Sequence, residues 1–380
     1  MSSYQKIVKK LLLAAGIEVN GNNSWDLQVR NRKFYKRVLR DGSIGLGESY
    51  MEKWWDCDKP DEFLYRVFNA GLEQKIKKNL HLKWLVLKSK LFNLQKPSKA
   101  LKSIATHYNK GNQLYQKMLD PLMLYSCAYW QDAENLSEAQ QNKLELICTK
   151  LKLRPGLKLL DIGCGWGGFA YYAAKNYGVE VVGITISKEQ YTYAKEQCKD
   201  LPVEIRFQDY RSLNEKFDRI VSIGMLEHVG HKNYDSYMEV VQENLKEDGI
   251  CLLHFIGSNK SEYTTDPWIN KYIFPEGLIP SAAQIGKAIE NKLVLQDWHN
   301  FGKYYDKTLM AWYENFREAW PQLKQEYSDA FYRMWEFYLC SSAASFRANR
   351  LNLWQLVLTR KEFPDLYTSM RPVHLNPKEV

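Results

Sequence analysis

A glycine-rich loop directly after a short apolar segment is the first feature that could do chemistry. Residues 158–161 lead into Asp161-Ile-Gly163-Cys-Gly165-Trp-Gly167-Gly168, where a helical pattern begins. Glycine lets the backbone turn tightly and approach a ligand, and the first turn of a helix offers N–H groups without partners inside the helix. The loop therefore predicts a ligand site between a strand and a helix.

The spacing of this loop restricts the ligand. It is not the GxGxxG pattern of NAD sites, and an acidic residue before GxGxG is more typical of methyltransferases that use S-adenosylmethionine. We therefore expect Asp161, Gly163, Gly165 and Gly167 to bind that cofactor. Two alternatives stay open on these residues alone: a NAD-type loop, and a turn with a purely structural role.

Two further segment ends are expected beside the loop. Residues 180–184 are followed by Thr185-Ile-Ser, without the acidic residue that commonly binds ribose hydroxyls. Thr185 and the amide of Gln190 are expected to take that place. Asp209 and Tyr210 follow the apolar segment 203–207 and are expected near the adenine, because ligands of such sheets lie at the carboxyl ends of the strands.

Alternating strand and helix patterns surround these residues. Helices are expected at 168–177, 188–198 and 233–245, and a long helical insertion at about 308–349. Strands are expected at 158–161, 180–184, 203–207, 217–223, 250–256, 293–299 and 353–359. This alternation predicts an α/β fold with a doubly wound, mostly parallel seven-stranded, Rossmann-like sheet. The first 94 residues read as a small, mainly helical domain, followed by a linker at 95–104 and a catalytic domain at 105–380.

The charge of the chain is unevenly distributed. Its 380 residues carry 53 Lys and Arg against 44 Asp and Glu, and 21 of the basic but 10 of the acidic residues precede residue 105. A basic, amphipathic segment at 80–94 is typical of a helix on a membrane surface, although a helix that packs on a neighbour fits equally. An anionic partner, phospholipid or nucleic acid, is therefore expected for this domain, with a solvated basic face as the alternative.

The rest of the composition narrows the class of protein. Apolar residues make up 45% and charged residues 26%, as in globular chains. The seven cysteines are odd in number and lack CxxC spacing, which indicates a reduced cytoplasmic protein without a structural metal site. No apolar run approaches the roughly 20 residues that cross a bilayer, and the N-terminus lacks the plan of a signal peptide.

Six motifs together resemble those of cyclopropane-fatty-acyl-phospholipid synthases, which are S-adenosylmethionine-dependent methyltransferases of class I. The resemblance spans nearly the whole chain and includes the N-terminal segment around Trp54-Trp55. The motifs are His107-Tyr-Asn-Lys-Gly-Asn112, Tyr125-Ser-Cys-Ala-Tyr-Trp130, Leu160-Asp-Ile-Gly-Cys-Gly-Trp-Gly-Gly168, Gly183-Ile-Thr-Ile-Ser187, Gly224-Met-Leu-Glu-His-Val-Gly230 and Asp266-Pro-Trp-Ile-Asn-Lys-Tyr-Ile-Phe-Pro275.

The resemblance implies a reaction and a set of residues. The donor's methyl group adds to a cis double bond of a lipid acyl chain, and a base then removes a proton so that the ring closes. In the family this base is thought to be a bound bicarbonate ion. Its ligands here would be Cys127, Glu227, His254 and Tyr305, with the backbone of Ile256 nearby, and Tyr125 and Ser126 would contact the cofactor.

Each of these residues also has an ordinary interpretation. Cys127 could be a buried core cysteine, His254 a satisfied core histidine, and Glu227 a cap of the following helix. Tyr304 rivals Tyr305, and Cys340 is interpreted as core. Aromatic rings that could stabilise a cation through their faces are Tyr129, Trp268, Tyr272, Phe274 and Trp312.

Three functions compete at this point. The first is cyclopropane formation on phospholipids, by a homodimer bound peripherally to the cytoplasmic face of the membrane. The second is methylation of another acceptor, such as an amine, on the same fold. That reaction needs no base for a carbocation. The third is nucleic-acid binding by the basic domain, which is disfavoured because its basic residues form no RNA-recognition signature.

Overall fold

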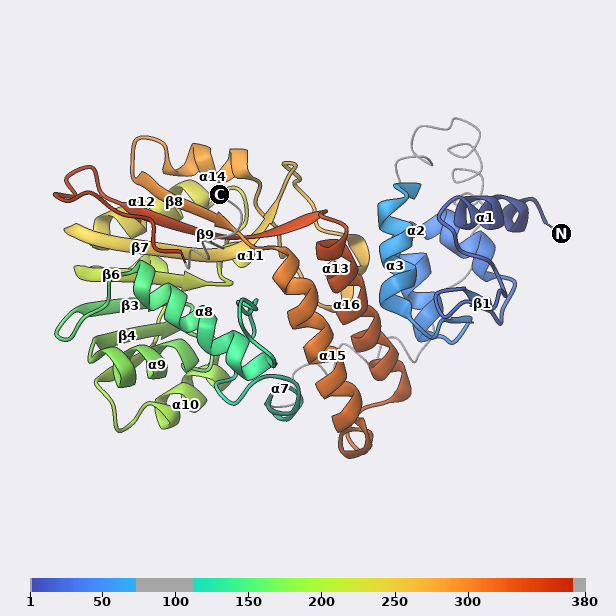
Figure 1. Ribbon diagram of the computed structural model, residues 1–380, viewed down its shortest axis with the longest axis horizontal. Helices are drawn as coiled ribbons and strands as arrows, with labels where there is room; N and C mark the ends of the chain where they lie inside the picture. The colour runs from blue at the N-terminus through green and yellow to red at the C-terminus, as the bar shows by residue number, and fades with distance from the viewer. Residues whose placement is uncertain (1, 73–111, 372–380) are drawn as a thin grey trace, which may run out of the picture. The chain divides into compact units, whose positions relative to one another are not determined.

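The computed structural model describes residues 2–72 and 112–371, which divide into two compact units (Figure 1). The sheet unit holds residues 119–263, 278–304 and 352–371. The helical unit holds residues 2–72, 112–118, 264–277 and 305–351. The basic segment at 80–94, the linker at 95–104 and most of the motif at 107–112 lie outside the described residues. The domain boundaries at 94 and 105 therefore stay predictions.

One seven-stranded sheet forms the centre of the sheet unit, with the strand order β5-β4-β3-β6-β7-β9-β8. The pairs β3–β4, β4–β5, β3–β6 and β6–β7 are parallel, whereas β8 and β9 are antiparallel. The predicted doubly wound, mostly parallel α/β fold is confirmed. The strands are β3 Lys158–Ile162, β4 Glu180–Thr185, β5 Val203–Phe207, β6 Phe217–Ile223, β7 Leu245–Ser258, β8 Val294–Asn300 and β9 Leu351–Thr359.

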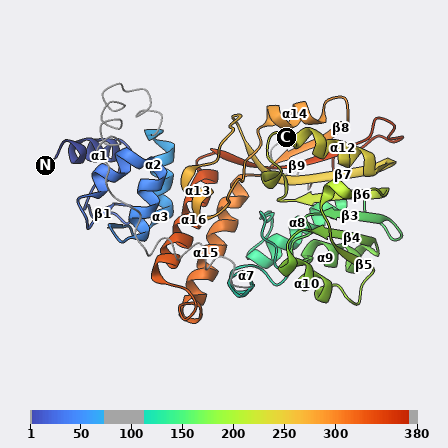
Figure 2. The ribbon, with the colours of Figure 1, turned by 180° about the vertical axis from the view of Figure 1, so that it is seen from behind.

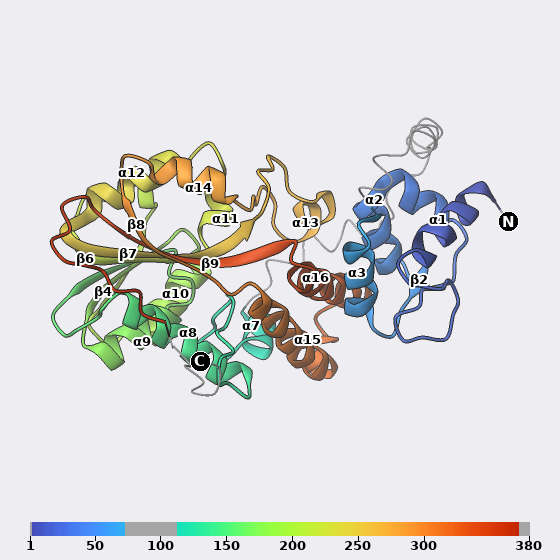
Figure 3. The same ribbon diagram turned by 45° about the horizontal axis from the view of Figure 1, so that its top comes forward.

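Helices cover both faces of this sheet (Figures 1 and 3). On one face α8 Leu136–Lys150 and α9 Gly168–Tyr177 bury a cluster that includes Ile147, Phe169 and Val221. On the other, α12 Tyr234–Asn244 and α14 Ala282–Ile289 bury a second cluster. Successive residues of β6 point into opposite clusters, because side chains alternate along a strand. Shorter elements are α10 Lys188–Gln197, the 3-10 helix η1 Tyr210–Ser212 and α11 Leu226–Val229.

The strand order reverses direction at β3, which has β4 on one side and β6 on the other. Loops that leave the carboxyl ends of two such strands diverge and leave a crevice, where ligands of open α/β sheets bind. The glycine loop follows β3 at this point, and the predicted residues Thr185 and Glu227 follow or end the two neighbouring strands. The topology therefore gathers sequence-distant residues at one edge of the sheet.

The helical unit combines the N-terminal helices with the long insertion. Tyr50 donates a hydrogen bond to Glu336 Oε2 at 2.5 Å, and Tyr313 donates to Oε1 of the same carboxylate at 2.6 Å. Arg333 Nε donates to the backbone oxygen of Tyr50 at 2.5 Å. The N-terminal segment thus packs on residues that the sequence assigns to the catalytic domain. The elements are α1 Ser3–Leu13, β1 Gln28–Val29, α2 Phe34–Met51, β2 Trp55–Asp56, α3 Pro60–Asn69, α7 Gln113–Met118, α13 Pro267–Tyr272, α15 Lys303–Leu323 and α16 Asp329–Arg347.

Two observations bear on the expectations from composition. Across residues 2–72 and 112–371, none of the helices combines the length and the apolar character that crossing a bilayer requires. Six of the seven cysteines are buried, and all seven are free thiols. Cys340 lies fully buried in α16, as a core residue would.

Candidate functional site

Left-handed backbone conformations shape the glycine loop between β3 and α9. Gly163, Gly165 and Gly167 have φ angles of 80°, 56° and 84°, which residues with a Cβ rarely adopt. A Cβ on Gly168 would lie 2.2 Å from the backbone oxygen of Leu122, so this position also excludes larger residues. The loop therefore places the backbone N–H groups of the α9 N-terminus where a ligand can approach them.

Asp161 is a buried carboxyl group at the end of β3. Its exposed fraction is 2%, and burial raises its pKa to about 7. A carboxyl group with a raised pKa favours a cationic partner, because binding a cation recovers the free energy lost by desolvation. S-adenosylmethionine carries a sulfonium and an ammonium group, so Asp161 and the glycine loop fit this cofactor.

The ribose-binding pair expected from the sequence is brought together at the end of β4. Thr185 Oγ1 donates to Gln190 Oε1 at 3.1 Å, and Ser187 caps α10 by accepting a hydrogen bond from the backbone N–H of Gln190 at 3.4 Å. Figure 2 shows α10 beside β4 and β5 from behind. Thr185 is buried and Gln190 is half-buried, so both lie at the edge of the crevice.

The residues expected near the adenine differ in their surroundings. Asp209 accepts two hydrogen bonds from the Arg211 guanidinium, at 2.9 and 2.7 Å, which lower its pKa. The Tyr210 ring lies 5.1 Å from that of Tyr237. Sequence reasoning missed Ile186, which directly follows β4 and is 68% exposed, as an apolar candidate for contact with an adenine ring. Its signal in the sequence is an apolar residue between Thr185 and Ser187, directly after the predicted strand.

Polar side chains of α8 hold the loop that carries Tyr125, Ser126 and Cys127. Gln140 Nε2 donates to the backbone oxygens of Leu124 at 3.2 Å and Ser126 at 3.0 Å. Lys143 Nζ donates to Ser126 Oγ at 2.9 Å. Ser126 and Cys127 are buried, and Tyr125 is half-buried.

Sequence reasoning missed both of these α8 residues. Their signal is a position on the apolar face of the helix: Gln140 and Lys143 are spaced one turn apart and alternate with Leu136, Ala139 and Leu144. A polar or charged residue in such a stripe must find a partner when the helix is buried.

Glu227 lies in α11, directly beyond β6. Its two carboxylate oxygens differ in their hydrogen bonding. Oε1 accepts a hydrogen bond from the backbone N–H of Ile256 at 2.7 Å. Oε2 is buried and has no hydrogen-bond partner among the described residues. Burial raises the pKa of this carboxyl to about 7, against the opposing effect of the Ile256 N–H. A large fraction of Glu227 is therefore protonated at neutral pH and can donate an O–H. The backbone N–H of Ile256 is therefore occupied by Glu227. His228, the next residue in α11, is exposed.

His254 lies in β7, opposite Ile223 of β6. The side chain is 1% exposed, and burial lowers its pKa well below the usual range, with the charges of Lys143 and Lys150 acting in the same direction. Gln355 Nε2 lies 3.2 Å from Nδ1. When this amide donates, the proton of the neutral ring is on Nε2, which is buried and has no partner in the described part of the chain. His254 therefore presents an N–H donor. Gln355, a fully buried amide inside an apolar strand, was missed from the sequence.

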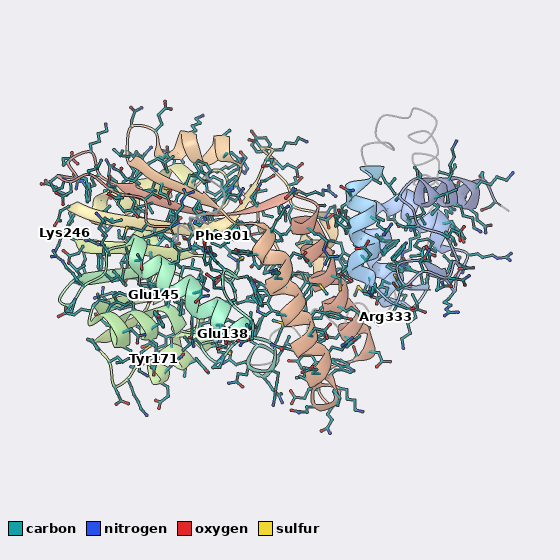
Figure 4. All side chains as sticks on the ribbon, viewed as in Figure 1. Glu138, Glu145, Tyr171, Lys246, Phe301 and Arg333 are labelled. Atoms are coloured by element: carbon teal, nitrogen blue, oxygen red, sulfur yellow. The ribbon has the colours of Figure 1, made fainter. Side chains whose placement is uncertain are left out.

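Aromatic rings line the surroundings of His254. Phe301, labelled in Figure 4, directly follows β8, and its ring lies 5.9 Å from the imidazole of His254. The ring of Tyr129 lies 5.2 Å from Phe301 and 5.3 Å from Tyr304. Of the aromatic residues proposed from the sequence, Tyr129 belongs to this cluster. The others, Trp268, Tyr272, Phe274 and Trp312, are residues of the helical unit.

The four expected anion ligands divide between the two units. Cys127, Glu227 and His254 belong to the sheet unit, whereas Tyr305, near the start of α15, belongs to the helical unit. The Tyr305 ring contacts Trp312 and Phe346, with centroid distances of 5.9 and 4.6 Å. The grouping of Tyr305 with the other three residues stays a prediction. No cluster of His, Cys, Asp or Glu suited to a metal ion occurs in the described ranges.

Comparison with known proteins places this geometry in context. Residues 95–356 match the family model described as mycolic acid cyclopropane synthetase. A curated Escherichia coli K12 protein, cyclopropane-fatty-acyl-phospholipid synthase, is 54% identical over 358 residues, covering 94% of each chain. A probable fatty acid methyltransferase of Pseudomonas putida is 35% identical and covers 68% of this chain and 69% of its own length.

Two solved structures of cyclopropane synthases are also similar to this chain. The cyclopropane synthase MmaA2 of Mycobacterium tuberculosis is 29% identical, with a TM-score of 0.64, and covers 70% of this chain and 100% of its own. The mycolic acid cyclopropane synthase CmaA1, complexed with SAH and CTAB, is 30% identical with a TM-score of 0.63 and the same coverage.

Proposed function

This chain belongs to the mycolic acid cyclopropane synthetase family, and from this premise we propose how its residues carry out the reaction. The chain is an S-adenosylmethionine-dependent enzyme. It transfers a methylene group from that donor to the cis double bond of an unsaturated phospholipid acyl chain and forms a cyclopropane ring. The observation that carries the mechanism is a pair of buried atoms, Glu227 Oε2 and His254 Nε2, at the carboxyl ends of neighbouring strands. Neither has a hydrogen-bond partner within residues 2–72 and 112–371.

The reaction sets three tasks for the site. Methyl transfer to an alkene leaves a positive charge on the acyl chain. The site must exclude water, which would otherwise trap this cation, it must stabilise the charge, and it must accept the proton that leaves the new methyl group.

Glu227 and His254 supply donors for a small buried anion. We infer that bicarbonate binds there and supplies the base. His254 contributes its Nε2–H, and protonated Glu227 contributes an O–H from Oε2. A protonated Glu227 removes the difficulty of two negative groups in contact, because a neutral carboxyl group does not repel an anion. Cys127, fully buried in the neighbouring loop, is a third proposed ligand, and Tyr305 of the helical unit is a fourth.

Aromatic faces next to His254 support the second task. Phe301 contacts the imidazole, and Tyr129 and Tyr304 contact Phe301 and each other, with centroid distances between 5.2 and 6.1 Å. Ring faces attract cations without acting as nucleophiles. We propose that this cluster stabilises the cationic acyl chain and keeps water away from it.

The cofactor residues complete the proposal. S-adenosylmethionine supplies the methylene group when it is bound. Asp161 fits its cationic part, the α9 N-terminus and Gly163–Gly167 fit close backbone approach, and Thr185 with Gln190 fits ribose hydroxyls. Tyr125, Ser126, Asp209 and Tyr210 are the remaining proposed contacts.

The membrane-facing part of the proposal rests on the basic N-terminal region. Lys6, Lys10, Arg32 and Lys33 are exposed, and Leu13 of α1 is 63% exposed. Exposed cations beside an apolar side chain suit reversible binding to an anionic bilayer. We propose that the enzyme acts as a homodimer bound peripherally to the cytoplasmic face of the membrane, and sedimentation of the purified chain tests the dimer.

Mass spectrometry of phospholipids tests the reaction. Vesicles with monounsaturated chains are incubated with the enzyme and with S-adenosylmethionine labelled in its methyl group. The expected product gains one labelled CH2 for each double bond lost. Retention of the alkene, or labelling of an amine headgroup instead, would contradict ring formation and favour methylation of another acceptor.

A further inference from the structure

Lys143 is a fully buried lysine in the middle of α8. Its side chain has no exposed surface, and the hydrophobic residues Leu144 and Ile147 follow it in the core. Its ammonium donates a hydrogen bond to Ser126 Oγ at 2.9 Å, and no carboxylate pairs with it in the part of the chain that the structure describes. A buried charge without an ion pair is costly, so its presence requires a compensating group.

Lys150, two turns later on the same helix, is a buried lysine whose charge is compensated by an ion pair. It is equally buried, but its ammonium lies 3.3 Å from Asp297 Oδ2 and 3.1 Å from His299 Nδ1. Asp297 also pairs with Arg371. The two lysines thus share helix, burial and residue type, and they differ in whether a described carboxylate lies within ion-pair distance of the ammonium.

The position of Lys143 relates it to both sides of the anion site. Ser126, its hydrogen-bond acceptor, directly precedes Cys127 in the chain. The lysine charge in turn lowers the pKa of His254. Asp120 is the nearby acidic group, but its oxygens accept the backbone N–H groups of Leu122 and Leu124 at 2.9 Å each.

We propose that Lys143 is a positioning residue that acts through Ser126 and supplies the buried positive charge that compensates the anion held by Cys127, Glu227 and His254. This inference rests on the proposed function, because it concerns the same anion. The other side chains proposed as ligands contribute hydrogen-bond donors but no positive charge: His254 is neutral, and Glu227 is neutral at best. A buried anion needs charge compensation as well as hydrogen-bond donors. Lys143, which is bonded to Ser126, provides the positive charge.

A dependence on pH follows from this arrangement. Burial lowers the pKa of Lys143 to about 8, while Asp120 and Cys127 oppose the shift. The lysine is therefore mostly charged at pH 7 and loses its charge above about pH 8. Bicarbonate should bind less tightly as the pH rises through this range. Glu227, with a pKa of about 7, and His254 face the same anion, so the effect of Lys143 is read from the difference between variants.

The experiment measures the bicarbonate concentration that gives half-maximal cyclopropane formation, in buffers freed of carbon dioxide and supplied with sodium bicarbonate. Lys143→Met removes the charge and the donor, and Lys143→Gln removes the charge but keeps a donor for Ser126. Lys150→Met is the matched control, a buried lysine of the same helix that has its own carboxylate. A second readout is the rise in thermal midpoint that bicarbonate gives each protein, which does not depend on turnover.

We expect both Lys143 variants to need about tenfold more bicarbonate at pH 7, which corresponds to about 1.4 kcal/mol. The rise of this requirement above pH 8 should be smaller in both variants than in the wild type. Both variants should keep a single cooperative thermal transition, which shows that they fold. Lys150→Met should lower the thermal midpoint without changing the bicarbonate requirement.

The possible outcomes separate the two proposals. If the wild type responds to bicarbonate and both Lys143 variants respond identically to it, the role of Lys143 is wrong and the anion proposal stands. If Lys143→Gln behaves as wild type and Lys143→Met does not, the hydrogen bond to Ser126 matters and the charge does not, which also overturns the inference. A wild type that ignores bicarbonate in both readouts rejects the anion and, with it, this role of Lys143.

Discussion

Glu227 and His254 reach the site with one end of each side chain already occupied. The Ile256 N–H holds Glu227 Oε1, and the Gln355 amide holds His254 Nδ1, so Oε2 and Nε2 remain for a ligand. Anchoring one end fixes the direction of the other, as second-layer hydrogen bonds do for histidine ligands of metals. Burial also keeps the imidazole neutral and the carboxyl partly protonated. Donor identity in this site is therefore a consequence of burial.

Loss of the His254 imidazole should remove a donor from the reaction site. We expect His254→Ala to lower the turnover number by about a hundredfold or more, the range found for positioned proton-handling groups. S-adenosylmethionine affinity should change little, because His254 is not among the predicted cofactor contacts. Gln355→Leu should cause a smaller loss. His228→Ala, an exposed histidine in the same α11 region, is the control. Comparable losses in all three variants would argue against a specific role for His254.

The buried Asp161 carboxyl should lower the stability of the cofactor-free chain and strengthen cofactor binding. The folded chain keeps its proton up to about pH 7, whereas the unfolded chain releases it near pH 4. Fewer protons on the unfolded state mean that the stability contribution of Asp161 falls as the pH rises from 4 to 7 and then stays low. Without cofactor, Asp161→Asn should raise the free energy of unfolding at pH 8 by a few kcal/mol and much less at pH 4.

Urea unfolding at the two pH values measures this change, and titration with S-adenosylmethionine measures affinity. We expect the Asn variant to bind at least about tenfold more weakly, because one charge–charge interaction is lost. A variant that is less stable at pH 8, or that binds the cofactor as well as the wild type does, would refute this assignment of Asp161.

At the scale of elements, two packed layers and one strand–loop–helix junction position the site. The glycine loop joins β3 to α9 at the point where the strand order reverses, and α8 packs on the same face as α9. Gln140 and Lys143 of α8 fasten the 124–127 loop. The backbone oxygen of Leu122, just before this loop, lies so close to α9 that Gly168 has no room for a Cβ. The glycine loop and the segment that leads into Tyr125, Ser126 and Cys127 are therefore held close together.

Gly167 offers a test of this junction with a matched control. Its φ is 84°, and an added Cβ would lie 2.9 Å from the Cβ of Ala194 in α10. Gly156 has nearly the same φ, 82°, but an added Cβ meets nothing within 4 Å. Gly156→Ala should cost only the backbone strain, about 1 kcal/mol. Gly167→Ala should cost more and weaken S-adenosylmethionine binding at least about tenfold.

Thermal unfolding and cofactor titration of the two variants separate strain from contact. Equal losses of stability and unchanged cofactor affinity in both would mean that the close approach at Gly167 is unimportant. A loss of affinity in Gly167→Ala alone would support the role of the loop in cofactor binding.

At the scale of the whole molecule, the excess of basic residues and the proposed site residues occupy different parts of the sequence. The whole positive excess precedes residue 105, and the proposed site residues of the sheet unit follow it. Removing the N-terminal segment is a poor test of this division, because Tyr50 satisfies the buried carboxylate of Glu336 in α16. Deletion would leave that carboxylate with a lost partner and confound binding with folding.

Neutralising exposed cations is a cleaner test of membrane binding. We expect a variant with Lys6, Lys10, Arg32 and Lys33 changed to Gln to bind anionic vesicles at least about fivefold more weakly, because each basic residue near such a surface contributes on the order of 1 kcal/mol. The difference should shrink in high salt. Activity on detergent-dispersed lipid should stay near normal. A control changes the same number of exposed lysines in the sheet unit, namely Lys175, Lys195, Lys232 and Lys287.

Co-sedimentation with vesicles and with RNA across a range of salt concentrations gives the measurement. Unchanged vesicle binding in the N-terminal variant would remove the membrane role of these residues. Strong binding to RNA, lost in the same variant, would instead favour the nucleic-acid alternative.

The sequence alone determined the fold class and the family, and it predicted the cofactor loop. Local patterns suffice for these: the glycine spacing after 158–161 and the alternation of strands and helices are short-range features. The prediction failed mainly where polar residues begin a strand, as at Lys246-Glu-Asp-Gly249 in β7, because an apolar pattern cannot mark such a start.

Only the tertiary structure decided which atoms face which. That Gln355 of β9 orients His254 of β7, that Ile256 holds Glu227, and that Lys143 reaches Ser126 are contacts between segments up to about a hundred residues apart. No local pattern encodes them, because the partner of a buried polar atom is set by how strands and helices pack. The protonation of Glu227, Asp161 and Lys143 follows from the same packing, since burial rather than sequence sets their pKa values.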